Sequence, residues 1–333
     1  MDLGPTFHPE SQRLQDLRSK RQRINAGRVE LGVSYLDDCL GGVYPRDLLL
    51  VGAATGVGKT ALAVDMALSG AKAGREVYLF ALEAEEGEVA DRLYYNLLGQ
   101  LAKDPRLDFA GWSRGEHEDI TEQYHDQIVA ELTPLLGKLH VLYKGKGDFT
   151  ALNLSQRLEG VANLADMVVL DHVHVIDVEG SESELRAQAK TVRLLRDLAL
   201  DGELPIVAVS HLRKKGVGER NLLLPDIDDL HGTSTLSKVA TQVVLFSRDW
   251  DGPRPKRHLS PTLIKIAKDR RGRAGPYVAR IYYDLSSGGY ESAYEIGRVE
   301  WQNRKQCWTR LPVHNVPSWA VHDAGRLSAE IPI

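Results

Sequence analysis

The sequence predicts an α/β fold in which a mostly parallel, twisted sheet is covered by helices on both faces. From about residue 31, apolar runs bounded by turn residues alternate with helical patterns. The first five runs are continuously apolar rather than alternating, which is typical of strands buried on both faces. Strands that alternate with helices favour right-handed crossovers and therefore a parallel sheet.

Composition and charge limit the function classes. The chain has 333 residues, of which 43% are hydrophobic and 26% charged, so one large domain with appendages is expected. The formal net charge of −4 does not indicate nucleic-acid binding by the whole surface, so such a surface must be local. Two distant cysteines, Cys39 and Cys307, exclude a disulfide framework or a zinc module. With neither a membrane span nor a signal or transit peptide in sight, we expect a cytoplasmic protein without a membrane partner.

The first predicted helix covers residues 11–26, with Ser11 as its N-cap and Gly27 at its end. A narrow apolar stripe is formed by Leu14, Leu17 and Ile24, and basic residues crowd the other face. Two interpretations stay open: a solvated helix that lies on its own domain, or an arm that docks on a neighbouring subunit.

Strands and helices then follow in order. Strands are predicted at 47–52, 77–83, 139–143, 167–176, 205–212, 243–246, 262–268 and 277–283, and helices at 61–74, 88–101, 119–136 and 183–200. After about residue 290 the periodicity decays, and the tryptophan-bearing tail receives no assignment. We expect three parts: an arm at 1–28, a core domain at 29–290 and an extension at 291–333.

The stretch GAATGVGKT (52–60) follows a strand and precedes a helix, which is the context of a phosphate-binding P-loop. Successive backbone N–H groups and the helix N-terminus favour phosphate oxygens there. Lys59 is expected to reach the β- and γ-phosphates of a nucleotide, and the Thr60 hydroxyl to bind Mg²⁺. Ala53 stands where the usual pattern has glycine. The alternative is a turn that only joins strand to helix. The predicted phosphate-binding residues are Ala54, Thr55, Gly56, Val57, Gly58, Lys59, Thr60 and Ala61.

Polar residues end three other apolar runs, and the carboxyl ends of parallel strands share one edge of a sheet. Asp171 is a candidate Mg²⁺ partner, and Glu83 could orient a water for attack on the γ-phosphate. His211 could sense that phosphate, or be an ordinary strand-end residue. His172 and His174 would share one face of a strand; we favour an orientation toward the interior or a neighbouring loop over a metal site.

Two basic stretches complete the set. Arg213, Lys214 and Lys215 come just after the strand end at His211, beyond Leu212, and are candidates for binding a phosphate backbone. Residues 254–275 carry eight Lys and Arg side chains and one acid. Within them, Lys268 and Arg270 could stabilise charge on a transferring phosphoryl group, in the manner of an arginine finger. Spacing alone leaves open whether they serve their own site or a neighbour's.

This ordered set resembles the RecA-like motor domain of the superfamily 4 ring helicases, which include DnaB-type, phage helicase–primase and Twinkle proteins. The resemblance covers roughly residues 28–290, and DnaB-type proteins share the alanine at Ala53. It implies that Glu83 activates water, that Asp171 is the Walker B acid, and that His211 senses phosphate ahead of a DNA-binding loop. The segment 229–246, which includes Lys238, resembles the lining of the central channel, although the usual Arg–Gly–Ser–Gly reads His–Gly–Thr–Ser here.

The resemblance implies a RecA-like P-loop NTPase core that uses ATP and Mg²⁺, forms a homo-oligomer, by expectation a hexamer, and moves 5′–3′ on single-stranded DNA. Lys268 and Arg270 would then act on the next subunit's nucleotide, and the arm would dock on that subunit. A primase or loader is a further expected partner. No primase module or N-terminal helical domain is evident, as in motors of phages or mobile elements. The alternatives are a RecA-, RadA- or KaiC-type ATPase without unwinding, and a nucleotide-gated scaffold in replication or defence.

Overall fold

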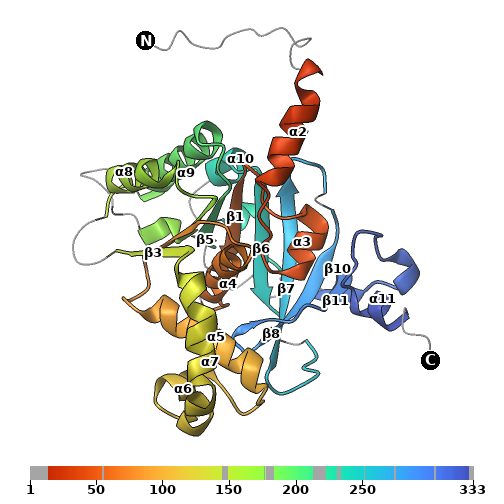
Figure 1. The fold of residues 1–333 in the computed structure, drawn as a ribbon. Helices are drawn as coiled ribbons and strands as arrows, with labels where there is room; N and C mark the ends of the chain where they lie inside the picture. Colours follow the sequence, from red (N-terminus) through yellow and green to blue (C-terminus); the bar gives the residue numbers. More distant parts are fainter. Residues whose placement is uncertain are drawn as a thin grey trace.

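The computed structural model describes residues 14–54, 56–144, 149–175, 177, 184–212, 223–230, 234–250, 252–273, 275–303 and 305–329. One twisted sheet runs through the molecule, with helices on both faces (Figure 1). Its parallel half is formed by β1 (Leu48–Ala53), β2 (Val77–Ala81), β3 (Leu139–Tyr143), β4 (Met167–Asp171), β5 (Ile206–His211) and β6 (Gln242–Arg248).

The parallel strands lie in the order β3-β2-β4-β5-β1-β6, and because β6 continues into the antiparallel strands, β1 lies near the middle of the whole sheet. Every residue of β1 is buried, because both faces of the strand are covered. Leu49 and Val51 belong to one core cluster, and Leu48 and Leu50 to the other. The predicted mostly parallel α/β fold is therefore confirmed.

Helices cover the two faces separately. On the face of Leu49 lie α3 (Ser34–Leu40), α4 (Lys59–Lys72), α5 (Glu88–Ala102), α6 (Phe109–Ser113) and α7 (Glu118–Leu136). On the other face lie α8 (Ala151–Val161) and α9 (Glu184–Asp201), and α10 (Ser234–Val239) packs beside α9. The amphipathic patterns of these segments each supply one buried stripe, which joins the corresponding cluster.

The second half of the sheet is antiparallel. It consists of β7 (Leu259–Asp269), β8 (Val278–Asp284), β9 (Gly289–Tyr290), β10 (Glu295–Gln302) and β11 (Lys305–Arg310), and it begins where β7 pairs with β6. The end of β7 consequently lies beside the start of β6, with Asp269 opposite Gln242. This reversal sets the position of the basic residues at 268–273.

The segment after residue 290, which has no sequence periodicity, continues the same sheet. The predicted boundary at 290 falls between β9 and β10, and beyond β11 come η4 (Val313–Asn315) and α11 (Ala324–Ala329). Tyr294 Oη donates a 2.6 Å hydrogen bond to Asp38 of α3, and Trp319 packs 6.0 Å from Tyr35 between ring centroids. These contacts tie the extension to the core.

One predicted strand is too long. The apolar run 167–176 predicts a strand throughout, but β4 ends at Asp171 and the 3₁₀ turn η1 (Val173–Val175) follows. The pairing with β2 also stops at Asp171, and the next backbone bond from that side, Leu82 N–H to the Asp171 carbonyl, closes the ladder. His172 and His174 are therefore not neighbours on a strand face.

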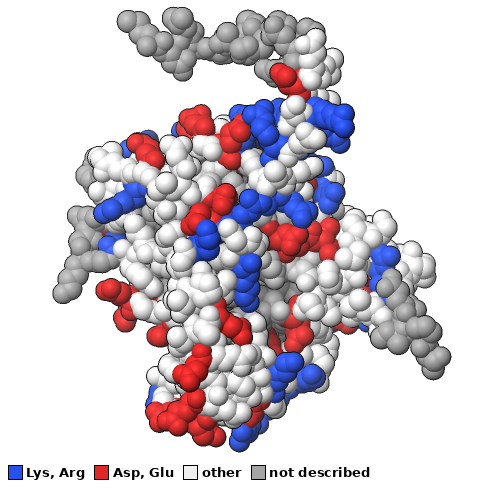
Figure 2. Space-filling model, in the orientation of Figure 1, with Lys and Arg blue, Asp and Glu red and all other residues white. Residues whose placement is uncertain are grey.

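The helix α2 (Leu17–Ala26) has no buried residue and projects from the body of the fold (Figure 1). Leu14 and Leu17 are 70% and 46% exposed, and only Ile24 of the apolar stripe is partly covered within the described chain. Figure 2 shows basic side chains gathered over α2 and acidic ones over α7, so the charge is unevenly distributed. Among the helices described, none is long and apolar enough to cross a bilayer.

Candidate nucleotide-binding site

The phosphate-binding loop connects the end of β1 to the start of α4 at Lys59. Gly56 and Gly58 have φ angles of +79° and +99°, a region that side-chain-bearing residues rarely adopt. A Cβ on Gly56 would meet no atom within 4 Å, so the backbone angle, rather than crowding, favours glycine here. Thr55 lies outside the described residues.

Lys59 is buried and its Nζ donates a 2.9 Å hydrogen bond to the Ala54 carbonyl. Burial lowers the pKa of its ammonium, while the nearby carboxylates of Asp171 and Glu83 raise it. The cation is thus held over the loop, close to two acids, where a phosphate chain would supply the negative charge that a buried ammonium needs.

Asp171 fits the role of a Mg²⁺ partner. It is 2% exposed, the Thr60 hydroxyl donates a hydrogen bond to it, and its Oδ1 has no partner within the described structure. Burial raises its pKa to about 6, against the lowering effect of Thr60. A buried carboxylate oxygen without a donor, beside a hydroxyl, is a donor set that suits Mg²⁺.

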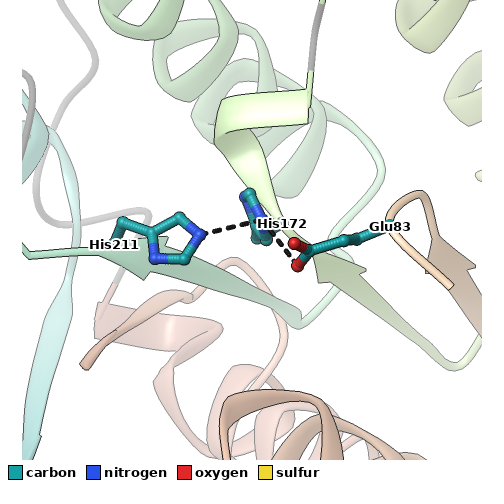
Figure 3. A group of neighbouring side chains, drawn as sticks. All are labelled: Glu83, His172 and His211. Atoms are coloured by element: carbon teal, nitrogen blue, oxygen red, sulfur yellow. Dashed lines mark hydrogen bonds and ion pairs between the residues drawn. The ribbon is translucent and has the colours of Figure 1, made fainter. Parts of the chain in front are cut away.

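Glu83 and His211 are joined by His172, for which the sequence predicted an interior or loop-facing orientation but no contact with these two residues (Figure 3). His172 Nε2 lies 2.9 Å from Glu83 Oε2 and 3.0 Å from His211 Nε2. Burial lowers the pKa of His172 to about 4, with the Lys59 cation adding to the effect, so the imidazole is neutral at physiological pH. His172 does face the interior, and His174 Nε2 contacts Ser210 Oγ at 3.1 Å.

A cavity of about 210 Å³ adjoins the phosphate-binding loop. The sequence does not predict it, because its walls come from several elements that only the tertiary fold brings together. Its lining includes Gly56, Val57, Gly58, Ala61, Asp65, Arg92, Phe109, Arg248 and Tyr283. A weak local signal for the cavity is an arginine, Arg248, close behind the apolar run 243–246.

Lys268 and Arg270 lie at the opposite edge of the sheet from the loop. Arg270 N–H donates to the Thr241 carbonyl at 3.1 Å, and Thr241 N–H donates to the Leu48 carbonyl at 3.0 Å, which places both beside the start of β1. The loop leaves the far end of this strand, roughly 17 Å away. The two cations therefore cannot reach a nucleotide held by their own loop.

The side-chain contacts of these two cations differ. Lys268 Nζ donates to the carbonyls of Ser237 and Ala240 at 2.5 and 2.7 Å, and so caps α10. Burial, and then the charges of Arg270 and Arg196, lower its pKa. The side chain of Arg270 is exposed, and its guanidinium forms no hydrogen bond or ion pair with another described residue.

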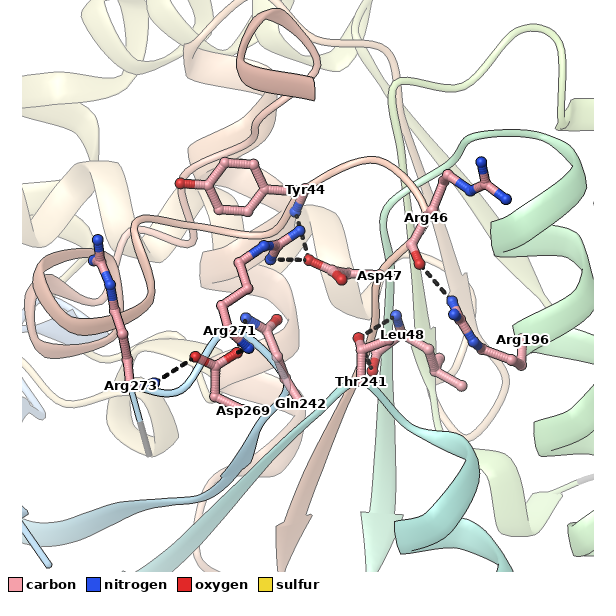
Figure 4. Close-up of polar contacts among 10 residues, drawn as sticks. All are labelled: Tyr44, Arg46, Asp47, Leu48, Arg196, Thr241, Gln242, Asp269, Arg271 and Arg273. Carbon is pink, nitrogen blue, oxygen red and sulfur yellow. Dashed lines mark hydrogen bonds and ion pairs between the residues drawn. The ribbon is translucent and has the colours of Figure 1, made fainter. Parts of the chain in front are cut away.

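The residues around Arg270 are held by several polar contacts (Figure 4). Arg271 pairs with Asp47 and stacks 4.1 Å over the Tyr44 ring, while Arg196 Nη1 donates to the Arg46 carbonyl. The contacts of Arg271, together with the hydrogen bonds from the Arg271 and Arg273 backbone N–H groups to Asp269, hold the turn that presents Arg270.

Of the predicted DNA-binding residues, the structure describes one. Lys238 is exposed at the end of α10, and its carbonyl accepts a 3.2 Å bond from Lys268 Nζ. Arg213, Lys214 and Lys215 lie outside the described residues, so their predicted role stays a prediction.

A central β1, a glycine loop that opens α4, and an acid at the end of β4 define a P-loop NTPase of the RecA-like α/β class. More specifically, residues 28–286 match the family model of the DnaB-like helicase C-terminal domain. The chain belongs to this family.

Individual relatives are more distant. The chain is 26% identical over 259 residues to the replicative DNA helicase DnaB of Geobacillus stearothermophilus, covering 74% of this chain and 53% of the relative. It is 26% identical over 241 residues to a probable plasmid replicative DNA helicase of Chlamydia trachomatis, covering 68% and 47%. The chain thus spans about half the length of these curated relatives.

Solved structures agree on the fold. A structure described as an isolated ATPase domain superposes with a TM-score of 0.68 at 18% identity, covering 86% of this chain and 99% of that one. A DnaB-like replicative helicase, studied with its primase interactions, gives 0.64 at 18% identity, covering 87% and 67%. A KaiC-like protein from Pyrococcus horikoshii gives 0.52 at 16% identity, covering 79% and 97%.

Proposed function

We propose that this protein is an ATP-driven translocase on single-stranded DNA that works as a replicative helicase ring. The observation that carries the proposal is the separation of the phosphate-binding loop from Lys268 and Arg270 by the full length of β1. A site that needs both halves is complete only between two copies of the chain, and a head-to-tail contact that closes gives a ring.

The chemistry at the loop follows from its residues. Lys59 binds the β- and γ-phosphates, and Thr60 and Asp171 hold Mg²⁺, which neutralises charge on the transferring group. Glu83, whose side chain is 58% exposed, orients the attacking water. His211 contacts the γ-phosphate and reports its loss.

The neighbouring copy supplies the rest. Its Lys268 and Arg270 stabilise charge on the γ-phosphoryl group in the transition state, an effect worth about 10³–10⁵ in turnover for an arginine finger. Arg270 suits this role because its side chain is exposed and its guanidinium lacks a described partner. Lys268 is placed next to it at the same edge.

The cavity beside the loop suits the nucleoside. Tyr283 and Phe109 offer aromatic surface, and Arg248 and Arg92 offer cations in its wall. Because Ala61 and Gly58 line both the cavity and the loop, a nucleotide with its phosphates on the loop directs its base there.

Movement on DNA is assigned to the segment that follows the sensor. Arg213, Lys214 and Lys215 grip DNA phosphates, and Lys238 adds a cation from α10, so affinity should fall steeply with salt. The assembly is expected to be a hexamer that moves 5′–3′, with α2 docked on the adjacent copy. The relative studied with primase makes a primase or loader a candidate partner.

The test is ATP hydrolysis with and without single-stranded DNA, together with displacement of a labelled strand. We expect stimulation by DNA, unwinding, and loss of both in Lys59→Ala. DNA-stimulated hydrolysis without unwinding would favour a binding ATPase, the class to which the KaiC-like structural relative draws attention. Nucleotide binding with no turnover would favour a gated scaffold.

A further inference from the structure

The hydrogen bonds around His172 determine where its ring carries a proton. The backbone N–H of His174 donates to His172 Nδ1 at 3.2 Å, so Nδ1 is an acceptor. A neutral imidazole with Nδ1 as acceptor carries its proton on Nε2. This N–H faces two acceptors, Glu83 Oε2 at 2.9 Å and His211 Nε2 at 3.0 Å.

The His172 ring has little freedom to rotate or to contact other partners. Its side chain is only 5% exposed, and it meets the His211 ring edge-on at 4.2 Å between centroids (Figure 3). The short 3₁₀ turn after β4 supplies the His174 N–H and so sets the orientation of the ring. Because one N–H forms one strong hydrogen bond, Glu83 and His211 compete for it.

We propose that His172 is a positioning residue that couples the carboxylate of Glu83 to His211 through its shared Nε2–H. When His211 turns toward a phosphate, the N–H passes wholly to Glu83 and fixes the carboxylate in one orientation. When His211 returns, it draws the N–H back and releases Glu83. Only Leu212 separates His211 from the basic residues 213–215, so the same contact would link the water-activating group to the predicted DNA-binding segment.

A transition-metal site is the rival interpretation of the same residues. One atom each of Glu83, His172 and His211 lie within 4.8 Å of one another, and two imidazoles and a carboxylate are ligands that Zn²⁺ accepts. A metal would need the lone pair of His172 Nε2. Because Nδ1 accepts the hydrogen bond from His174 N–H, the proton of the neutral ring lies on Nε2, and that lone pair is not available. The hydrogen-bond pattern therefore favours the proton-sharing role.

The inference rests on the proposed ATPase activity and is tested within it. His172→Leu removes the N–H at similar volume, and His172→Gln restores a side-chain N–H near the same place. We expect His172→Leu to lower kcat for ATP by about tenfold to hundredfold, by analogy with residues that orient metal ligands through a hydrogen bond. KM for ATP should change little, and DNA should stimulate the remaining activity less; His172→Gln should recover most of both.

Two controls separate this role from a structural one. His125→Leu changes an exposed histidine on α7, bonded to Tyr94 Oη, and should leave turnover unchanged. Glu83→Gln combined with His172→Leu should be no slower than Glu83→Gln alone, because a residue that acts through Glu83 has nothing left to orient.

Several outcomes would overturn the inference while leaving the proposed function intact. These are an active wild type with an equally active His172→Leu, a Gln variant no better than Leu, or additive effects in the double variant. Stoichiometric zinc in the purified protein, lost in His172→Leu, would establish the metal site instead. An inactive wild-type chain would refute the proposed function itself, and the inference with it.

Discussion

Asp65 places a buried carboxyl group in the wall of the candidate nucleotide site. It lies on α4 one turn after Ala61 and lines the cavity beside the loop, and its Oδ2 is buried without a described partner. Burial raises its pKa from 3.8 to about 8, with Lys72 and Arg92 opposing the effect. The folded chain therefore holds this proton where the unfolded chain has lost it.

The sign of the resulting pH dependence is fixed. Because the pKa of Asp65 is higher in the folded chain, its protonated carboxyl stabilises the fold fully below the unfolded pKa of 3.8. This contribution to the free energy of unfolding is lost as the pH rises through about 8. Between pH 5 and 8 the free energy of unfolding should fall by about 1 kcal/mol or more relative to Asp65→Asn. Urea unfolding of the nucleotide-free chain measures this, with exposed Asp126→Asn as the control; equal pH slopes for wild type and Asp65→Asn would contradict the account.

The sequence named Lys59, Thr60 and Asp171, which lie close together in the structure, and their roles toward phosphate and Mg²⁺ stay predictions. Lys59, Thr60 and Asp171 follow from local motifs, because a strand, a glycine turn and a strand-end acid are encoded by neighbouring residues. The contacts of His172 with Glu83 and His211 were not predictable, because they depend on β4 ending at Asp171 and on the 3₁₀ turn that follows it. Arg248, Tyr283 and Asp65 meet only through contacts between distant elements.

At the scale of elements, β7 is the strand on which the proposed site between two copies rests. Its antiparallel pairing with β6 carries Lys268 and Arg270 to the edge opposite the loop. The strand and the basic residues are visible in the sequence, but their distance from their own loop depends on the direction of the strand. That direction is a property of the pairing, which no local pattern encodes.

Substitutions of Lys268 and Arg270 should differ in their effect on the free energy of unfolding. Lys268 Nζ donates to carbonyls at the end of α10, so Lys268→Ala should lower the free energy of unfolding by about 1 kcal/mol. Arg270→Ala removes an exposed side chain and should leave the unfolding free energy within about 0.5 kcal/mol of the wild type. Both should lose ATP turnover. Denaturant titration beside ATPase assays tests this, and an equal loss of stability in both variants would be inconsistent with the structure.

At the scale of the whole molecule, the extension after residue 290 is part of the sheet rather than an appendage. Trp308 of β11 donates a 3.0 Å hydrogen bond from Nε1 to the Val278 carbonyl, and Arg280 lies 3.9 Å over its ring. Arg280 in turn pairs with buried Asp249 at 2.8 Å. Sequence patterns do not reveal this, because Trp308 lies 30 residues from Val278 and Arg280 lies 31 residues from Asp249.

The two tryptophans of this hairpin offer a matched comparison. Trp308→Ala removes a half-buried ring packed under Arg280 and should lower the unfolding free energy by about 2–3 kcal/mol, below the range for fully buried aromatic residues. Trp301→Ala removes a ring that is 61% exposed and should cost much less. Thermal unfolding of both variants measures the difference, and similar losses would show that the extension is not integrated as described.

The most direct test of the shared site mixes two inactive variants. Arg270→Ala keeps the loop and lacks the finger, whereas Lys59→Ala lacks the loop cation and keeps the finger. If ATP is hydrolysed between subunits, mixed assemblies should regain DNA-stimulated turnover, with about a quarter of the interfaces complete in a random ring. No recovery in assemblies shown to contain both variants, or full activity of Arg270→Ala alone, would contradict the account.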